Sequence, residues 1–134
     1  MTDGRGIPLA TILTGANEHD VTQLVPLIDR IPRLRQRDGT RRHRPVAAIA
    51  DRAYDSADHR RQLRRRGIGS LIARRGVSHG SGLGILRWVV ERTHSWLHQN
   101  RRLRVRFERL DSIHEAFMAL GCAMICWNFL TLSL

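Results

Sequence analysis

Lysine is absent from this 134-residue sequence, and all 23 of its basic residues are arginine. So complete an absence is typical of the codon bias of a GC-rich genome, and it does not by itself indicate selection for guanidinium chemistry. The surplus of basic over acidic residues, 23 − 12 = +11, is a separate property. A chain this basic favours polyanionic partners, and nucleic acid is the first of these to consider.

Cysteine is scarce as well: Cys122 and Cys126 are the two in the chain, four positions apart in an apolar run. That spacing suits two buried thiols on one side of a helix and offers only half of the ligands of a zinc site. We therefore expect neither a disulfide nor a metal there, which fits a reducing, cytoplasmic setting. The opening residues, "MTDGRGIP", lack the charged and long apolar regions of a signal peptide.

One uncharged run, residues 116–134, reaches the length of a membrane-spanning helix. Asn128 interrupts it, small residues dilute it, and no anchoring residues follow it. A core helix that is buried on all sides has the same composition. We expect such a core helix, with a tail-anchored membrane protein as the alternative.

The order of predicted elements is strand, helix, strand, helix, strand, helix, helix, which is an α/β pattern. These elements are expected at residues 7–14, 21–31, 46–51, 55–67, 70–75, 85–102 and 112–134. The strand at 46–51 reads as buried on both faces. An arginine-rich loop at about 32–45 is expected to be mobile, and a Gly/Ser-rich loop at 76–84 to be flexible. No internal repeat is visible, so residues 1–134 form one domain or part of one.

Several polar residues are expected to start helices. Asp20 is a candidate N-cap for the helix at 21–31, Asp55 or Ser56 for the helix at 55–67, and "SIHE" (112–115) reads as a capping box. The turn "DGRG" (3–6) opens the chain, but Met1 and Thr2 are too few to supply the first strand of a hairpin.

The strongest helical pattern covers residues 85–102. At 100° per residue, its apolar side chains share one face and a row of polar side chains lies on the other. The apolar face comprises Leu86, Val89, Val90, Thr93, Trp96 and Leu97. The polar face comprises Arg87, Glu91, His94, His98 and Arg102.

Two carboxylates in this predicted arrangement of strands and helices indicate a chemical function. Asp51 ends a strand, where open α/β sheets bind ligands, and Glu91 lies on the polar face of the long helix. Carboxylates hold Mg²⁺ and arginines hold flanking phosphates, so the pair indicates metal-assisted phosphoryl transfer on nucleic acid. Each acid has a structural alternative: Asp51 capping the next turn, and Glu91 forming an ion pair with Arg87 on a solvated face.

Four stretches together resemble a known family: "DGRGIPLATILTGANEHD", "ADRAYDS", "RGI…IARRG" and "GLGILRWVVERTHSWLHQNRRLRVRFER". They are similar to the catalytic core of bacterial insertion-sequence transposases of the DDE class, in the group named after insertion sequence five. The resemblance is to the C-terminal part of the catalytic domain and extends from Asp3 to about Leu130. An Asp in "ADRAYD" and a Glu in "RWVVERT" make the combination specific.

The resemblance implies a ribonuclease H-like fold in which three acids gather around two Mg²⁺ (or Mn²⁺) ions. Asp51 would be the second acid and Glu91, on the long catalytic helix, the third. The first acid lies on the family's first strand, upstream of the "DGRG" turn, so residues 1–134 are expected to be an incomplete version of the fold with a gap in its sheet. Asp3 lies in that turn and is not expected to replace the missing acid.

The long helix also bears on the family signature Tyr-x2-Arg-x3-Glu-x6-Lys. Arg87 and Glu91 match its Arg and Glu, while Gly84 and His98 stand where the Tyr and Lys would be. The side chains expected to grip the DNA backbone are Arg87, His98, Arg101, Arg102, Arg104 and Arg106. A merely solvated arginine face is the alternative.

The resemblance therefore implies a fragment of a DNA transposase, which performs metal-dependent strand cleavage and strand transfer at insertion-sequence ends. The chain is expected to be inactive alone, either as the downstream frame of a frameshifted transposase or as a non-catalytic DNA-binding remnant of a decayed element. Expected partners are transposon ends and target DNA, a second copy of the chain, or the product of an upstream frame, and no membrane.

Overall fold

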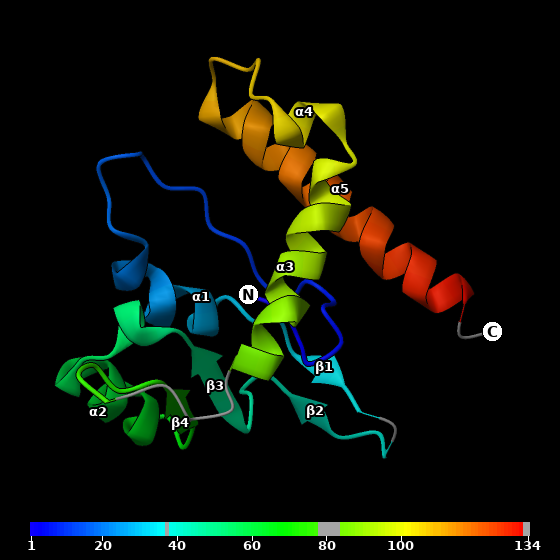
Figure 1. The fold of residues 1–134 in the computed structure, drawn as a ribbon. Coiled ribbons are helices and arrows are strands. Elements are labelled where there is room, and N and C mark those ends of the chain that lie inside the picture. Colours follow the sequence, from blue (N-terminus) through cyan, green and yellow to red (C-terminus); the bar gives the residue numbers. More distant parts are fainter. Residues whose placement is uncertain (37, 78–83, 133–134) are drawn as a thin grey trace. The chain divides into compact units, whose positions relative to one another are not determined.

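The computed structural model describes residues 1–36, 38–77 and 84–132 (Figure 1). For residues 84–87 it describes the backbone and not the side chains. The chain divides into two compact units. One comprises Met1–Leu13 together with Leu86–Leu134, and the other comprises Thr14–Ile85.

The unit Thr14–Ile85 is built on a parallel strand–helix–strand arrangement. Strand β3 (Ala47–Ala50) pairs in parallel with β4 (Gly69–Ile72), in a register that joins Ala47 to Gly69 and Ala50 to Ile72. Helix α2 (Ala57–Arg65) connects the two strands. A 3-10 turn, η1 (Asp20–Gln23), leads into α1 (Leu24–Asp29). The buried apolar side chains are Leu24, Ile28, Ile31, Ala48, Leu63, Ile68 and Ile72.

Helix α2 forms where local chemistry favours it. The Ser56 hydroxyl accepts a hydrogen bond from the backbone N–H of His59 at 3.0 Å, which satisfies one donor of the first turn. Asp58 lies in the first turn and Arg64 and Arg65 in the last, in the order that suits the helix dipole. Gly67 takes a φ of +69° just after the helix, as a terminating glycine should. The expected cap and stop are both confirmed.

The other unit consists of three helices and the N-terminal turn: α3 (Gly84–His98), α4 (Arg101–Arg104) and α5 (Asp111–Thr131). Helix α5 packs closely on the end of α3 and on α4 at Gly121, because a Cβ there would lie 2.8 Å from Leu103 Cδ1 and 3.1 Å from Leu97 Cδ2. Farther along α5, the ring of Phe129 meets the ring of Trp96 on α3 edge to face, with the ring centroids 5.5 Å apart.

The N-terminal turn is fastened to α3. Asp3 Oδ1 accepts from the backbone N–H groups of Arg5 and Ile7 at 2.9 and 2.8 Å, which shapes the turn. The Thr93 hydroxyl donates to the Gly6 carbonyl at 2.7 Å, and Arg92 donates to the Arg5 carbonyl. The contacts of Asp3 Oδ1 make Asp3 a turn-forming residue, and its expected non-catalytic role stays a prediction.

A stacked cation supports the same turn. The Arg92 guanidinium lies 4.2 Å from the centroid of the Trp88 ring and 4.8 Å from that of Trp96. The Met1 α-amino group donates to the Ala10 carbonyl at 2.9 Å, and burial lowers its pKa.

Three local expectations are wrong. Residues 7–14 form no strand; a single antiparallel bridge joins Thr2 to Pro8, because no longer segment lies alongside to pair with them. Asp20 lies inside the first turn, and the N-cap is His19 without a side-chain hydrogen bond. The "SIHE" capping box is also absent, since α5 begins at Asp111 with Leu110 as its N-cap.

The arginine-rich segment contains a short antiparallel ribbon, β1 (Leu34–Arg35) with β2 (Arg41–Arg42). The expected mobility of residues 32–45 stays a prediction. The Gly/Ser-rich loop falls mostly on residues 78–83, which lie outside the described part of the chain.

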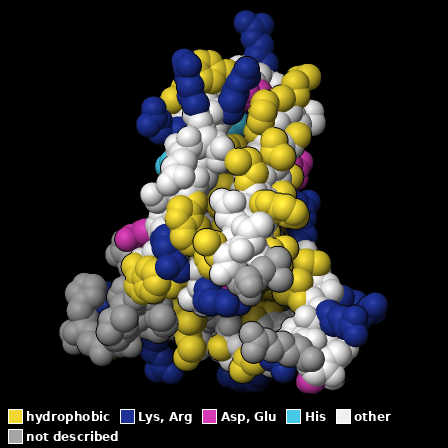
Figure 2. Space-filling model, turned by 90° about the vertical axis from the view of Figure 1, so that its right-hand side faces the viewer, with side chains coloured by type: hydrophobic (Ala, Val, Ile, Leu, Met, Phe, Trp, Pro, Cys, Tyr) yellow, Lys and Arg dark blue, Asp and Glu magenta, His cyan; other side chains and the backbone are white. Residues whose placement is uncertain are grey.

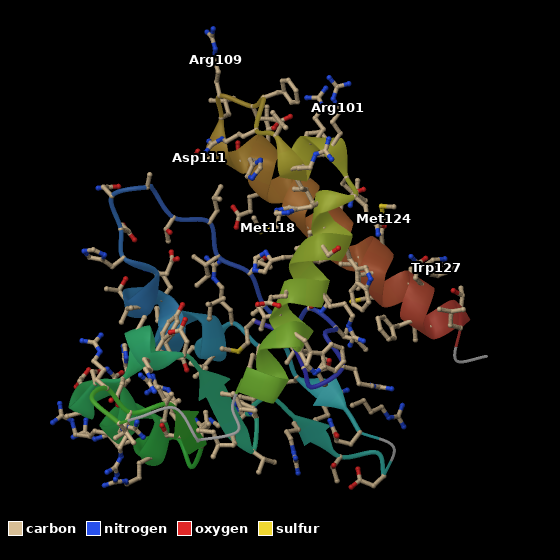
Figure 3. The ribbon with its side chains drawn as sticks, in the orientation of Figure 1. Arg101, Arg109, Asp111, Met118, Met124 and Trp127 are labelled. Atoms are coloured by element: carbon tan, nitrogen blue, oxygen red, sulfur yellow. The ribbon has the colours of Figure 1, made fainter. Side chains whose placement is uncertain are left out.

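Burial is lower than expected at two elements. In β3, Ile49 is 50% exposed, so the strand is not buried on both faces. In α5, only His114, Gly121 and Ile125 are buried, which contradicts a helix buried all round. Figure 2 shows hydrophobic side chains gathered on the face that α5 presents, and Figure 3 shows Met124 and Trp127 projecting from this helix. Within the described residues, α5 has the length and apolar composition to cross a membrane.

Candidate active site

Asp51 follows directly on β3 and is exposed. Its Oδ1 accepts from the backbone N–H of Ala53 at 2.8 Å, and the residue caps the short 3-10 turn η2 (Arg52–Tyr54). Asp51 therefore does cap the next turn, which was its structural alternative to a catalytic role. A carboxylate has lone pairs on both oxygens, so a cap through Oδ1 is compatible with a metal bond through Oδ2.

The turn after Asp51 is held by a network that the sequence pattern did not reveal. Asp55 accepts from Arg60 Nε and Nη2 at 2.8 and 2.6 Å, and from the backbone N–H of Arg75 at 2.8 Å. The Arg75 N–H and the Arg60 guanidinium lower the pKa of the Asp55 carboxyl. Arg75 in turn donates to the carbonyls of Arg52 and Ala53 at 3.1 and 2.8 Å. The segment that carries Asp51 is thus tied to α2 and to the residues that follow β4.

Tyr54 lies on the inner side of the same turn. Its pKa is raised, mainly by burial and also by the carboxylates of Asp20 and Asp51. Its backbone carbonyl lies 2.9 Å from His59 Nδ1.

Glu91 lies on the exposed face of α3, as the helical pattern predicts. It borders an open hollow of about 550 Å³ that is lined by Glu91, His94, Ser95, His98, Gln99 and Arg104. The Arg87 side chain lies outside the described residues, so both its contact with DNA and its ion pair with Glu91 stay predictions.

The two candidate acids belong to different units: Asp51 to Thr14–Ile85, and Glu91 to the unit that contains Leu86–Leu134. Their convergence at one site stays a prediction. Exposed carboxylates are the hard oxygen donors that Mg²⁺ and Mn²⁺ prefer, so the donor chemistry fits. Within the described residues, no cluster of three or more His, Cys, Asp or Glu side chains is close enough to hold a metal ion.

The arginines after α3 fall into two groups. Arg102 pairs with Glu108 at 2.6 Å and lowers the pKa of that carboxyl, while Arg106 pairs with Asp111. Arg101 and Arg104 are exposed and make no ion pair within the part of the chain that the structure describes. Figure 3 shows Arg101 directed away from α4. Among the four arginines of this segment in the predicted DNA-binding set, Arg101 and Arg104 are therefore the two without an acidic partner in the described part of the chain.

Comparison with known proteins assigns the chain to a family. The family model described as "Transposase DDE domain" matches residues 1–129, and the chain belongs to this family. Such a domain implies a ribonuclease H-like fold, consistent with the mixed helices and strands described above.

A relative from Burkholderia cepacia is described as "Putative transposase for insertion sequence element IS402". It is 62% identical over 130 residues, which are 97% of this chain and 62% of the relative, so the chain spans less than two thirds of that protein. No match is found among solved structures. The expected family, the DDE transposases of insertion sequences, is confirmed; membership of the insertion-sequence-five group stays a prediction.

Proposed function

We propose that this chain is the part of an insertion-sequence transposase that supplies two of its three metal-holding acids, Asp51 and Glu91. The supporting observation is that Asp51, in a chain of this family, is exposed at the end of β3 on a turn held by its own network of hydrogen bonds. The reaction is cleavage and strand transfer of DNA at insertion-sequence ends.

In this proposal the chain's residues position a phosphodiester. Mg²⁺ or Mn²⁺ ions, when bound, polarise the scissile phosphate and activate the attacking oxygen. The cap through Ala53 fixes Asp51, and the contacts of Asp55 with Arg60 and Arg75 fix the turn around it. Glu91 supplies the second carboxylate from the rigid helix α3.

The DNA-binding surface comprises Arg87, His98, Arg101, Arg102, Arg104 and Arg106. Arg101 and Arg104 contact phosphates directly, because Arg102 and Arg106 are engaged with Glu108 and Asp111. A second copy of the chain or an upstream product completes the assembly, which works in the cytoplasm, and α5 packs on protein rather than in a membrane.

The fold in this proposal is a ribonuclease H-like fold that lacks its first strand, and with it the first acid. Residues 1–134 alone then bind DNA without cutting it. A non-catalytic DNA-binding remnant would behave in the same way, but it would stay inactive after the missing strand was restored.

The proposal is tested by a nicking assay on DNA that carries the insertion-sequence ends. A full-length reconstruction that supplies the first acid is expected to nick this DNA with Mg²⁺ and to stop when the metal is chelated. The 134-residue chain is expected to bind the same DNA and leave it intact. A reconstruction that binds the ends but never nicks them would establish the remnant instead.

The arginine surface is tested by the salt dependence of DNA binding. An Arg101→Gln/Arg104→Gln variant is expected to lower the slope of log affinity against log salt by about 2 and to weaken binding roughly tenfold, because each phosphate contact releases close to one counterion. An Arg64→Gln/Arg65→Gln variant, with two exposed arginines of α2, serves as the control and should bind as the wild type does. An unchanged slope in the first variant would rule out this surface.

A further inference from the structure

Two histidines on α3 form a pair that the transposition chemistry above does not explain. Of the seven histidines in the sequence, His94 and His98 are the two that lie four positions apart. Both are exposed, and their ring centroids lie 6.2 Å apart with the planes tilted by 55°. Histidines one turn apart on one face of a helix can bind a single metal ion together.

The two rings are free to bind an ion. Among the described residues, neither ring makes a hydrogen bond or an ion pair, and both border the open hollow beside Glu91. A metal ion binds an imidazole nitrogen at about 2.0–2.1 Å, so one ion between the rings bridges a separation of this size after a small adjustment of side-chain torsions.

The donors define the class of ion. Imidazole nitrogen suits Zn²⁺, Cu²⁺ and Ni²⁺, whereas Mg²⁺ prefers carboxylate and water oxygens. With two protein nitrogens, the remaining coordination positions belong to water or to a phosphate oxygen.

We propose that His94 and His98 chelate one divalent transition-metal ion through their imidazole nitrogens, in the hollow that Glu91 also borders. This binding does not depend on whether the chain takes part in DNA cleavage. His98 thereby contacts DNA phosphates either directly or through the bound ion.

Isothermal titration of the 134-residue chain with Zn²⁺ tests the site. We expect one ion per chain, and we expect His94→Gln and His98→Gln each to weaken binding about tenfold or more, since each removes half of the protein's ligands. Both positions are exposed, and circular dichroism establishes that the variants keep their helices.

Three matched variants test whether Zn²⁺ binds to His94 and His98 or to other side chains that can bind a metal ion. His43→Gln removes an exposed histidine elsewhere, Cys122→Ala/Cys126→Ala removes the two thiols of α5, and Glu91→Gln removes the proposed Mg²⁺ ligand that borders the same hollow. All three are expected to bind Zn²⁺ as the wild type does, and the last separates this site from the proposed active site. Absence of binding by the wild type, retention of binding in both histidine variants, or its loss in any control would overturn the proposal.

Discussion

Replacing Asp51 by asparagine, or Glu91 by glutamine, is expected to slow metal-dependent nicking by the full-length reconstruction by roughly 10³-fold or more. Each change removes the charge that holds the ion and keeps the shape of the side chain. Asparagine at 51 retains an oxygen that can accept from the backbone N–H of Ala53, so the turn after β3 should survive. The measurement is the nicking rate at saturating DNA, together with DNA affinity, which should change little.

Two conservative replacements on exposed helical surfaces serve as controls. Asp58→Asn on α2 and Glu115→Gln on α5 remove the same charges away from the proposed site and should leave the nicking rate close to that of the wild type. If Asp51→Asn and Glu91→Gln nicked DNA as fast as these controls, the assignment of both acids would be wrong.

The Gly6→Ala substitution is expected to lower the free energy of unfolding by about 2 kcal/mol or more. A left-handed backbone costs an L-residue about 1–2 kcal/mol, and Gly6 has a φ of +84°. The new Cβ would also lie 3.0 Å from Thr93 Oγ1 and 3.4 Å from the Trp96 ring, where crowding adds a further cost of order 1 kcal/mol. Denaturant unfolding at equilibrium measures the change.

Two other glycines separate the cost of the left-handed backbone from the cost of crowding by the new Cβ. Gly39 has a φ of +82°, and a Cβ added there would have no atom within 4 Å, so Gly39→Ala carries the backbone cost alone. Gly4 has open space and no such φ, so Gly4→Ala should cost least. A Gly6→Ala variant no less stable than Gly39→Ala would contradict the close approach of the turn to α3.

Local signals predicted the strand–helix–strand arrangement of β3, α2 and β4 well. Ser56 and Gly67 act on their own helix, and the apolar run ending at Asp51 could pair with a nearby strand across α2. Residues 7–14 have the composition of a strand but no partner of matching length, and a strand is defined by its partner. Asp20 and Ser112 failed as caps because these helices begin one and two positions earlier, at residues whose side chains make no capping hydrogen bond.

Long-range contacts account for what sequence reasoning missed at the candidate site. Asp51 and Glu91 were predicted as site residues from the family resemblance, and that assignment stays a proposal, whereas the partners of Asp55 lie five and 20 residues away. With 23 arginines in the chain, no spacing rule singles out Arg60 and Arg75. The same holds for Arg102 and Arg106, whose acidic partners leave Arg101 and Arg104 as the two without an ion pair in the described part of this segment.

The absence of lysine gives the buried N-terminal group a practical meaning. In a polypeptide made to begin at Met1, the α-amino group of that residue is the one amine, and it is hydrogen-bonded to Ala10 in the turn that rests on α3. Acylating reagents therefore have a single amine target, which is shielded while the turn is docked and accessible once it detaches. The rate of acylation at this position reports opening of the N-terminal turn without any engineered probe.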